Sequence, residues 1–205
     1  MQKMLFTIIL SIGLSLSLNA KNIDAKLLET KNDLSFQKGY AKPFTGNAYY
    51  FYDNKEKKKI MPYYQGKKDG RYIEWRKDGS VKAIAYFKNG KQDGEYIAKY
   101  SNGKKGIIAY YRDGLQDGEV TTWYTNGKKK SSAYYKKDIQ DGESKTWYDN
   151  GNKATVGFYV KGKKTGLFTK WHRNGVKASQ GTYENGILLT KLKKWDEKGN
   201  YITKK

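Results

Sequence analysis

Residues 90–113, GKQDGEYIAKYSNGKKGIIAYYRD, contain one complete copy of a pattern that recurs along most of the chain. Gly94–Tyr100 alternates in polarity and is rich in aromatic residues, which is typical of a strand. Asn102–Gly103 follows, a dipeptide favoured in type I′ turns because both central residues need a positive φ. Gly106–Tyr111 is a second strand-like run. The stretch therefore predicts a β-hairpin with a type I′ turn at Asn102–Gly103.

Three series of glycines repeat with one period of 24 residues. The first series opens the predicted hairpins, with Thr190 in the seventh place: Gly46, Gly70, Gly94, Gly118, Gly142 and Gly166. The second series has Asp138 as its exception: Gly66, Gly90, Gly114, Gly162 and Gly186. The third series lies in the turns: Gly79, Gly103, Gly127, Gly151, Gly175 and Gly199. A fixed period of this length marks a repeat architecture, so we predict an all-β fold. It would be an elongated single-layer antiparallel sheet of about seven tandem hairpins, with about fourteen short strands and essentially no helix.

The chain divides into three predicted parts: a signal peptide at 1–20, an N-terminal lead segment at 21–41, and the repeats at 42–205. The predicted units are 42–65, 66–89, 90–113, 114–137, 138–161, 162–185 and a partial unit at 186–205. Lys3 precedes the apolar run Leu5–Leu18, and Ala20 precedes a polar stretch, so we expect cleavage after Ala20. An uncleaved anchor is the alternative, although a membrane span needs about 20 residues. Cleavage would leave an exported protein, at the periplasm, cell surface or outside, with no later transmembrane segment.

Composition excludes several kinds of site. The chain has no cysteine and one histidine, His172, which removes thiol catalysis, disulfides, Cys-based metal sites and multi-His metal centres. The formal net charge is +21, and lysine clusters lie mostly at predicted turns: Lys57–Lys59, Lys128–Lys130, Lys136–Lys137 and Lys161–Lys164. Their positive field would draw the protein to anionic lipid, polysaccharide or acidic proteins. Because we expect export, nucleic acid is not predicted as a physiological partner.

One tryptophan column is the candidate binding site: Trp75, Trp123, Trp147, Trp171 and Trp195. Two interpretations stand side by side, a strip that stacks on a ligand or partner and a strip that only packs the sheet. His172 falls in a column of tyrosines and is interpreted as a substitution rather than a site. The repeated Asp-Gly pairs indicate turn chemistry rather than calcium binding. We therefore predict no catalytic residue, no metal, no cofactor and no enzymatic activity.

The run from Gly90 to Lys104 resembles the MORN-repeat variant found in many bacteria, and Lys42–Asn47, KPFTGN, is similar to the opening of many such arrays. The resemblance covers residues 42–205. It implies an elongated twisted sheet of hairpins, a non-enzymatic role, and contacts with protein or lipid. Some bacterial relatives carry the label of antitoxins of toxin–antitoxin pairs, which act in the cytoplasm.

Three hypotheses of function follow from these features. The first is an exported non-enzymatic scaffold that binds a protein, an anionic glycan or a lipid surface. The second is a cell-envelope-anchoring module that recognises cell-wall sugars or choline through aromatic pockets. The third is a cytoplasmic antitoxin, which requires that residues 1–20 are not an export signal. The repeat predicts no particular oligomeric state.

Overall fold

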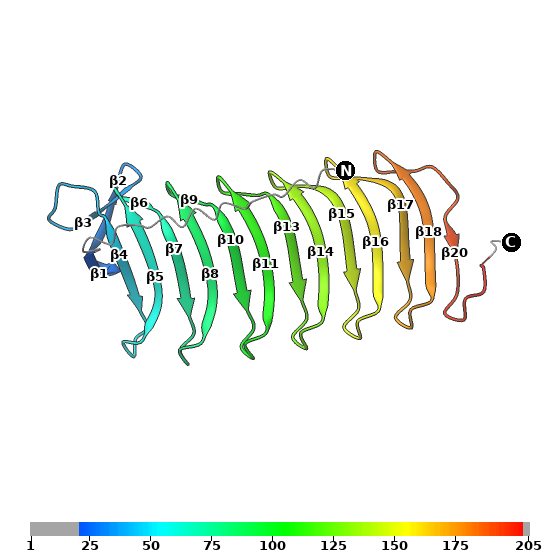
Figure 1. Ribbon diagram of the computed structural model, residues 1–205, viewed down its shortest axis with the longest axis horizontal. Helices are drawn as coiled ribbons and strands as arrows, with labels where there is room; N and C mark the ends of the chain where they lie inside the picture. The colour runs from blue at the N-terminus through cyan, green and yellow to red at the C-terminus, as the bar shows by residue number, and fades with distance from the viewer. Residues whose placement is uncertain (1–20, 203–205) are drawn as a thin grey trace, which may run out of the picture.

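The computed structural model describes residues 21–202, so the predicted signal peptide lies outside the described residues. The chain forms one long sheet in which successive hairpins lie side by side in chain order, without a second layer along most of its length (Figure 1). The predicted all-β, single-layer sheet of hairpins is confirmed. The hairpins are β4 (Gly46–Phe51) with β5 (Lys57–Tyr64), β7 (Gly70–Trp75) with β8 (Val81–Lys88), β10 (Gly94–Lys99) with β11 (Lys105–Arg112), β13 (Gly118–Trp123) with β14 (Lys129–Lys136), β15 (Ile139–Trp147) with β16 (Lys153–Val160), and β17 (Lys163–Trp171) with β18 (Lys177–Glu184).

The described chain has 20 strands, more than the fourteen or so expected. The excess comes from the lead segment and from two-residue strands that follow a hairpin and pair with the end of its second strand. These are β6 (Lys67–Lys68), β9 (Lys91–Gln92), β12 (Leu115–Gln116) and β19 (Ile187–Leu188). In the fifth and sixth hairpins these residues are continuous with β15 and β17. The sheet ends with β20 (Lys193–Lys194), which pairs with β18. The helical content of residues 21–202 is one three-residue 3-10 turn, η1 (Ala25–Leu27).

Strand alternation sorts the side chains onto two faces. We call one the alanine face, because from the second hairpin onward the centre of the second strand carries a small buried residue there: Ala85, Ala109, Ala133, Gly157 and Gly181. In the first hairpin the second strand has Met61 at this place, paired with the small Ala48 of β4. Aromatic rings pack beside this column, as where Tyr96 meets Tyr111 edge to face with centroids 6.4 Å apart. At Gly157 an added Cβ would clash with the ring of Phe168, so the column shrinks to glycine where a ring lies directly against the backbone. The core is therefore a thin aromatic layer spread along one face.

The turns correct one prediction. Gly103 has φ +78 as expected, but Asn102 does not have a positive φ, so this is not a type I′ turn. Tyr100 and Lys104 close a three-residue loop, in which Gly103 N–H donates to the Tyr100 carbonyl at 3.0 Å. That geometry is a type I turn followed by a glycine in the left-handed region. The type I′ conformation occurs at the other end of the hairpins, for example at Asp113–Gly114, with φ of 52° and 89°.

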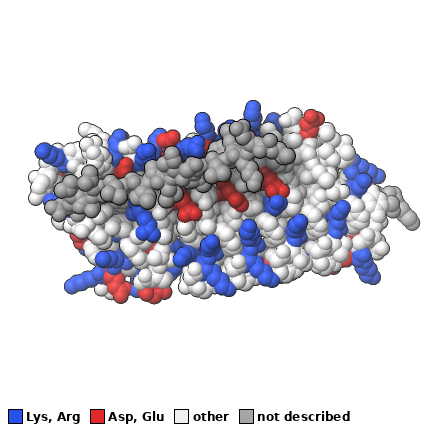
Figure 2. Space-filling view, viewed as in Figure 1, with Lys and Arg blue, Asp and Glu red and all other residues white. Residues whose placement is uncertain are grey.

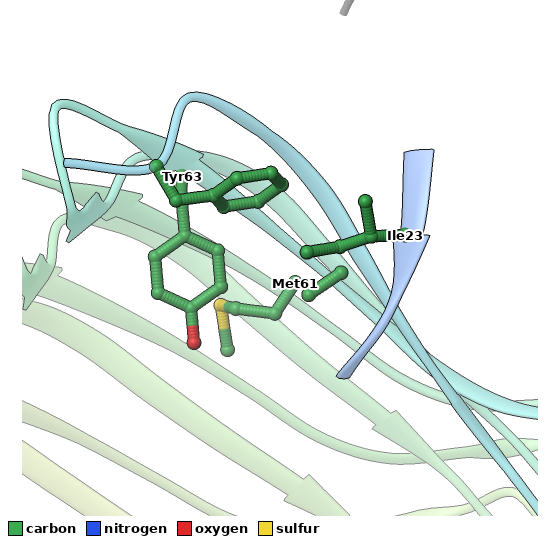
Figure 3. Close-up of a cluster of buried hydrophobic side chains, with 5 residues drawn as sticks. Ile23, Met61 and Tyr63 are labelled. Carbon is green, nitrogen blue, oxygen red and sulfur yellow. The ribbon is translucent and has the colours of Figure 1, made fainter. Parts of the chain in front are cut away.

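The lead segment caps the N-terminal end of the sheet. β1 (Lys21–Asp24) pairs in parallel with β4, an exception to the predicted antiparallel pattern, while β2 (Leu28–Lys31) and β3 (Leu34–Gln37) form a separate hairpin. Figure 3 shows Ile23 from β1 approaching Met61 and Tyr63 of the sheet. These side chains form the main buried cluster together with Phe44 and Ala48. A cap of this kind covers the edge that the first repeat would otherwise expose.

Candidate functional site

The glycines that open the hairpins have a structural role. All six have positive φ: Gly46, Gly70, Gly94, Gly118, Gly142 and Gly166. Gly46 shows why the residue is small, because a Cβ there would lie 2.1 Å from the Lys21 carbonyl oxygen of β1. A side chain at this position would displace the N-terminal cap.

Four residues of the tryptophan column end the first strand of a hairpin, where the register shifts by a β-bulge, and Trp195 forms an isolated bridge with Tyr201. The residues Trp75, Trp123, Trp147, Trp171 and Trp195 are all half-buried. The backbone carbonyl of each accepts a hydrogen bond from a side chain one repeat upstream. The donors are the hydroxyls of Tyr52 (2.9 Å), Tyr100 (2.6 Å), Tyr124 (2.8 Å) and Tyr148 (2.8 Å), and His172 Nε2 at 2.8 Å. Arg76 makes the same link to Lys99. His172 thus lies in the tyrosine column and makes the contact that the tyrosines make.

Lysine side chains of the protein itself lie close to three of the tryptophan rings. Lys105 Nζ lies 5.7 Å from the Trp123 ring centroid, Lys129 Nζ lies 6.0 Å from Trp147, and Lys177 Nζ lies 5.2 Å from Trp195. These distances are within the range of a cation–π contact. Each lysine comes from the preceding hairpin, so the contacts tie neighbouring repeats together.

Lysines also follow the edge of the sheet formed by the turns at 100–104, 124–128, 148–152 and 172–176, which we call the turn edge. Figure 2 shows Lys and Arg side chains along the lower part of the molecule, where Figure 1 has these turns. Lys104 Nζ donates to the Asn126 carbonyl at 2.7 Å, and Lys128 Nζ donates to the Asn150 carbonyl at 2.6 Å. Turn asparagines add a parallel ladder, as where Asn126 Nδ2 donates to the Asp149 carbonyl at 2.8 Å. Lys105, Lys129 and Lys153 begin the second strands at the same edge and are exposed, and we call these three the basic strip.

The face opposite the alanine face carries a second aromatic column that the sequence analysis did not single out. Glutamates and aromatics alternate across the strands, with Glu95 opposite Tyr110, Glu119 opposite Tyr134 and Glu143 opposite Phe158. Together with Tyr86 we call this set the tyrosine–glutamate row. Its rings are well exposed: Tyr86 38%, Tyr110 42%, Tyr134 48% and Phe158 45%. The signal was available in the strand parity, since these residues fall one position after the small-residue column.

A shallow hollow of about 140 Å³ lies beside this row. Its lining consists of the aromatic residues Tyr110 and Trp123 together with Ile108, Thr121 and the carboxylate of Glu119. The Thr121 hydroxyl donates to Glu119 Oε1 at 2.9 Å, and the Tyr110 hydroxyl donates to Glu95 Oε1 at 3.2 Å. Burial, and then the Glu95 carboxylate, raise the pKa of the Tyr110 phenol above its ordinary value, so the hydroxyl keeps its proton. The arrangement offers two aromatic walls and fixed hydrogen-bond acceptors.

Carboxylates of the repeated aspartates accept hydrogen bonds from backbone N–H groups. Asp69 accepts from the Asn89 N–H at 3.1 Å, and Asp93 accepts from the Asp113 N–H at 3.1 Å. Within residues 21–202 no group of three or more His, Cys, Asp or Glu side chains is placed to hold a metal ion. In the same part of the chain, no helix has the length and apolar character needed to cross a membrane.

Comparison with known proteins gives one family. The family model of the MORN repeat variant matches residues 116–137, 140–161 and 164–185. Each matched segment covers most of one hairpin, β13–β14, β15–β16 and β17–β18 respectively. No curated protein matches the chain at a significant level.

Proposed function

Since the chain carries MORN repeats of the variant family, whose members are in general non-enzymatic scaffolds, we propose that this protein is an exported, non-enzymatic scaffold that binds an anionic partner along its turn edge. The partner would be an acidic protein, an anionic glycan or a lipid surface. The observation that carries this proposal is the basic strip, in which one exposed lysine recurs at the same place in successive hairpins.

The spacing of the basic strip suits an extended partner. Equivalent lysines are two strands apart, which is roughly 9.6 Å. Exposed charges act over about 8 Å at physiological ionic strength, so neighbouring lysines of the strip repel one another only weakly. Each lysine can then contact its own anionic group on the partner. Each lysine near an anionic surface contributes about 1 kcal/mol. Binding would then be the sum of several similar contributions.

Export is part of the proposal and is supported by the sequence of residues 1–20, where the apolar run and Ala20 form the pattern of a cleaved signal. Cell fractionation followed by N-terminal sequencing tests this part. A mature protein that begins at Lys21 supports export. A cytoplasmic protein that still begins at Met1 overturns it and favours the antitoxin hypothesis instead.

The tryptophan rings favour the scaffold over the capture of choline-like cations. A quaternary ammonium would need the face of an aromatic ring. At Trp123, Trp147 and Trp195 a lysine ammonium of the protein already lies within 6.0 Å of the ring centroid. A choline group would have to displace that lysine at each of these three rings.

A charge-neutral variant of the basic strip tests the binding surface. Lys105, Lys129 and Lys153 are replaced together by glutamine, and binding to phosphatidylserine vesicles and to polygalacturonate is measured over a range of salt. We expect a loss on the order of 100-fold, because three contributions of about 1 kcal/mol are removed.

The matched control replaces Lys67, Lys91 and Lys163 by glutamine; these lysines are also exposed and also repeat, but lie at the opposite edge of the sheet. The net charge changes equally in both variants. We expect the control to lose much less affinity than the strip variant. Equal losses would show that net charge alone drives binding and that the turn edge is not the site.

A further inference from the structure

We propose that the tyrosine–glutamate row is a second binding site, for an extended β-1,4-linked glycan of uncharged sugars that lies across the strands along the length of the array. This inference rests on the tyrosine–glutamate row, not on the basic strip, and on ring stacking and hydrogen bonds, not on attraction between opposite charges. It stands on the hollow at Tyr110, on the spacing of the exposed rings, and on the charge of the glutamates.

The hollow has the features of a sugar subsite. Tyr110 presents an exposed aromatic surface, onto which the C–H groups of a pyranose ring pack favourably, and Trp123, whose ring is also contacted by Lys105, lines the hollow beside it. Glu119 supplies acceptors for sugar hydroxyls, and the Thr121 hydroxyl already donates to its Oε1 atom, which orients the carboxylate. A site that combines ring-stacking surfaces with a few fixed polar groups is typical of small-ligand recognition. A hollow of about 140 Å³ accommodates about one sugar ring.

One repeat further on, Tyr134, Glu143 and Trp147 stand at the positions of Tyr110, Glu119 and Trp123, while Ser132 and Lys145 replace Ile108 and Thr121. Tyr110 and Tyr134 are two strands apart, or roughly 9.6 Å. A β-1,4-linked glycan turns each ring by half a revolution relative to the one before, so the same ring face recurs once per disaccharide. An extended disaccharide spans about the same length as two strands. Each tyrosine would therefore meet the same face of every second sugar.

The ends of the row limit the site to the central hairpins. On the N-terminal side, Lys99 stands where the following hairpins have tryptophan, so Tyr86 has no tryptophan partner. On the C-terminal side, Leu167 stands in the glutamate column and Thr182 in the aromatic column. The complete combination of tyrosine, glutamate and tryptophan occurs in two consecutive hairpins, with Phe158 and Trp171 extending it.

Charge selects which glycan fits. Glu95 and Glu119 place carboxylates on this face, while Glu143 is paired with Lys145 (Nζ to Oε2, 2.6 Å), and Figure 2 shows acidic side chains gathered midway up one face, over the central hairpins, above the lysines. Carboxylates there repel uronic acids and sulfated sugars and accept hydrogen bonds from hydroxyl or amide donors. The row is thus complementary to neutral sugars such as glucose or N-acetylglucosamine, and it excludes the anionic partners that the turn edge attracts.

The test measures binding of chitohexaose and of cellohexaose to the full chain by isothermal titration calorimetry and by tryptophan fluorescence. We expect affinity to rise from the disaccharide to the hexasaccharide, and a change in fluorescence because Trp123 and Trp147 line the subsites. Chitohexaose and cellohexaose separate recognition of the acetamido group from recognition of the ring and linkage. Binding should change little with salt, in contrast to vesicle binding through the basic strip.

Two variants localise the site. Tyr110→Ala with Tyr134→Ala removes both rings and should weaken binding tenfold or more, since an aromatic contact of this kind is worth roughly 2- to 10-fold and distant sites add. Tyr64→Ala is the matched control, because Tyr64 is also exposed but lies in β5, outside the row. Tyr110→Phe with Tyr134→Phe keeps the rings and should retain most of the affinity even if the alanine variant folds poorly.

Several outcomes would overturn the proposal. One is the absence of binding by both hexasaccharides at millimolar concentration, and another is an equal loss in the Tyr64→Ala control. Polygalacturonate binding that is lost with the tyrosine pair would show that the row takes acidic polymers instead. Failure of the proposed function would appear in a different experiment, as vesicle binding that is unchanged when the lysines of the basic strip are replaced by glutamine.

Discussion

Replacing Gly142 by alanine, with Gly166→Ala for comparison, separates two reasons for a glycine at the start of each hairpin. Both glycines have positive φ, +134 at Gly142 and +74 at Gly166. At Gly142 an added Cβ would lie 2.8 Å from Cβ of Tyr134, whereas at Gly166 nothing lies within 4 Å. The substitution is the same, the position in the repeat is the same, and only one of the two sites is crowded.

The structure sets the expected difference. A non-glycine residue in either conformation costs about 1–3 kcal/mol of unfolding free energy. Crowding adds about 1–3 kcal/mol at Gly142 alone, because the contact is between two Cβ atoms that no rotamer change can separate. We therefore expect Gly142→Ala to be the more damaging by about 1–3 kcal/mol. Urea unfolding of the full chain followed by tryptophan fluorescence measures both losses. Equal losses, or a larger loss for Gly166→Ala, would refute the reasoning from close approach.

Three further expectations concern stability and binding. Gly127→Val should lower the unfolding free energy by more than about 1 kcal/mol, because a β-branched residue does not fit a φ of +92, and unchanged melting would contradict the observed turn. Trp123→Ala or Lys129→Ala alone should weaken binding to anionic vesicles only modestly, as measured by sedimentation. Deletion of Gly114–Lys137 should keep the fold and lower the affinity by a fraction. Complete loss of binding through one substitution would mean a unique site. Burial raises the pKa of Tyr63 from 10.0 to about 12, so stability is fully present below pH 10 and falls as the pH rises from 10 toward 12. Urea midpoints against pH should show this fall, and Tyr63→Phe should reduce it; a stability that rises over that range would contradict it.

The repeat and its hairpins were predictable because a fixed period imposes the same side chain on the same place in every unit. The 24-residue period also identified the tryptophan column, and the register of the hairpins then shows which strand partners its members have. His172 was predictable in the same way: it falls in the tyrosine column, and its Nε2 lies 2.8 Å from the Trp195 carbonyl oxygen. The role of a residue in a repeat can be predicted from the equivalent residues of the neighbouring repeats, because they share its surroundings.

The turn type was wrong because the dipeptide does not set the length of its loop. Asn-Gly suits a two-residue type I′ loop, but here Asn102 Oδ1 accepts from the Lys104 N–H at 3.1 Å, which stabilises a different turn. The loop gains a residue, and only the glycine needs a positive φ. Tyr100 and Lys104 pair across it, which the local sequence alone does not require.

The lead segment was not predictable from periodicity, because it stands outside the repeat. The parallel pairing of β1 with β4 and the burial of Ile23 against Met61 depend on contacts between residues far apart in the chain. The tyrosine–glutamate row needed a further step. Glutamates and exposed tyrosines each formed visible columns, but their alternation across neighbouring strands follows only once the register of each hairpin is known.

The hydrogen bonds between strands in this sheet run along the long axis of the molecule (Figure 1). A stretching force applied to the two ends of the array would therefore load these bonds one after another, as in opening a zipper, rather than all together in shear. The N-terminal end is held by the buried cluster around Ile23 and Met61, while the C-terminal end closes with the two-residue strand β20. Rupture would begin at the C-terminal end and proceed hairpin by hairpin. Each step would release one repeat of 24 residues, or roughly 80 Å of extended chain, so that the protein lengthens in regular increments under low force while the remaining repeats stay paired.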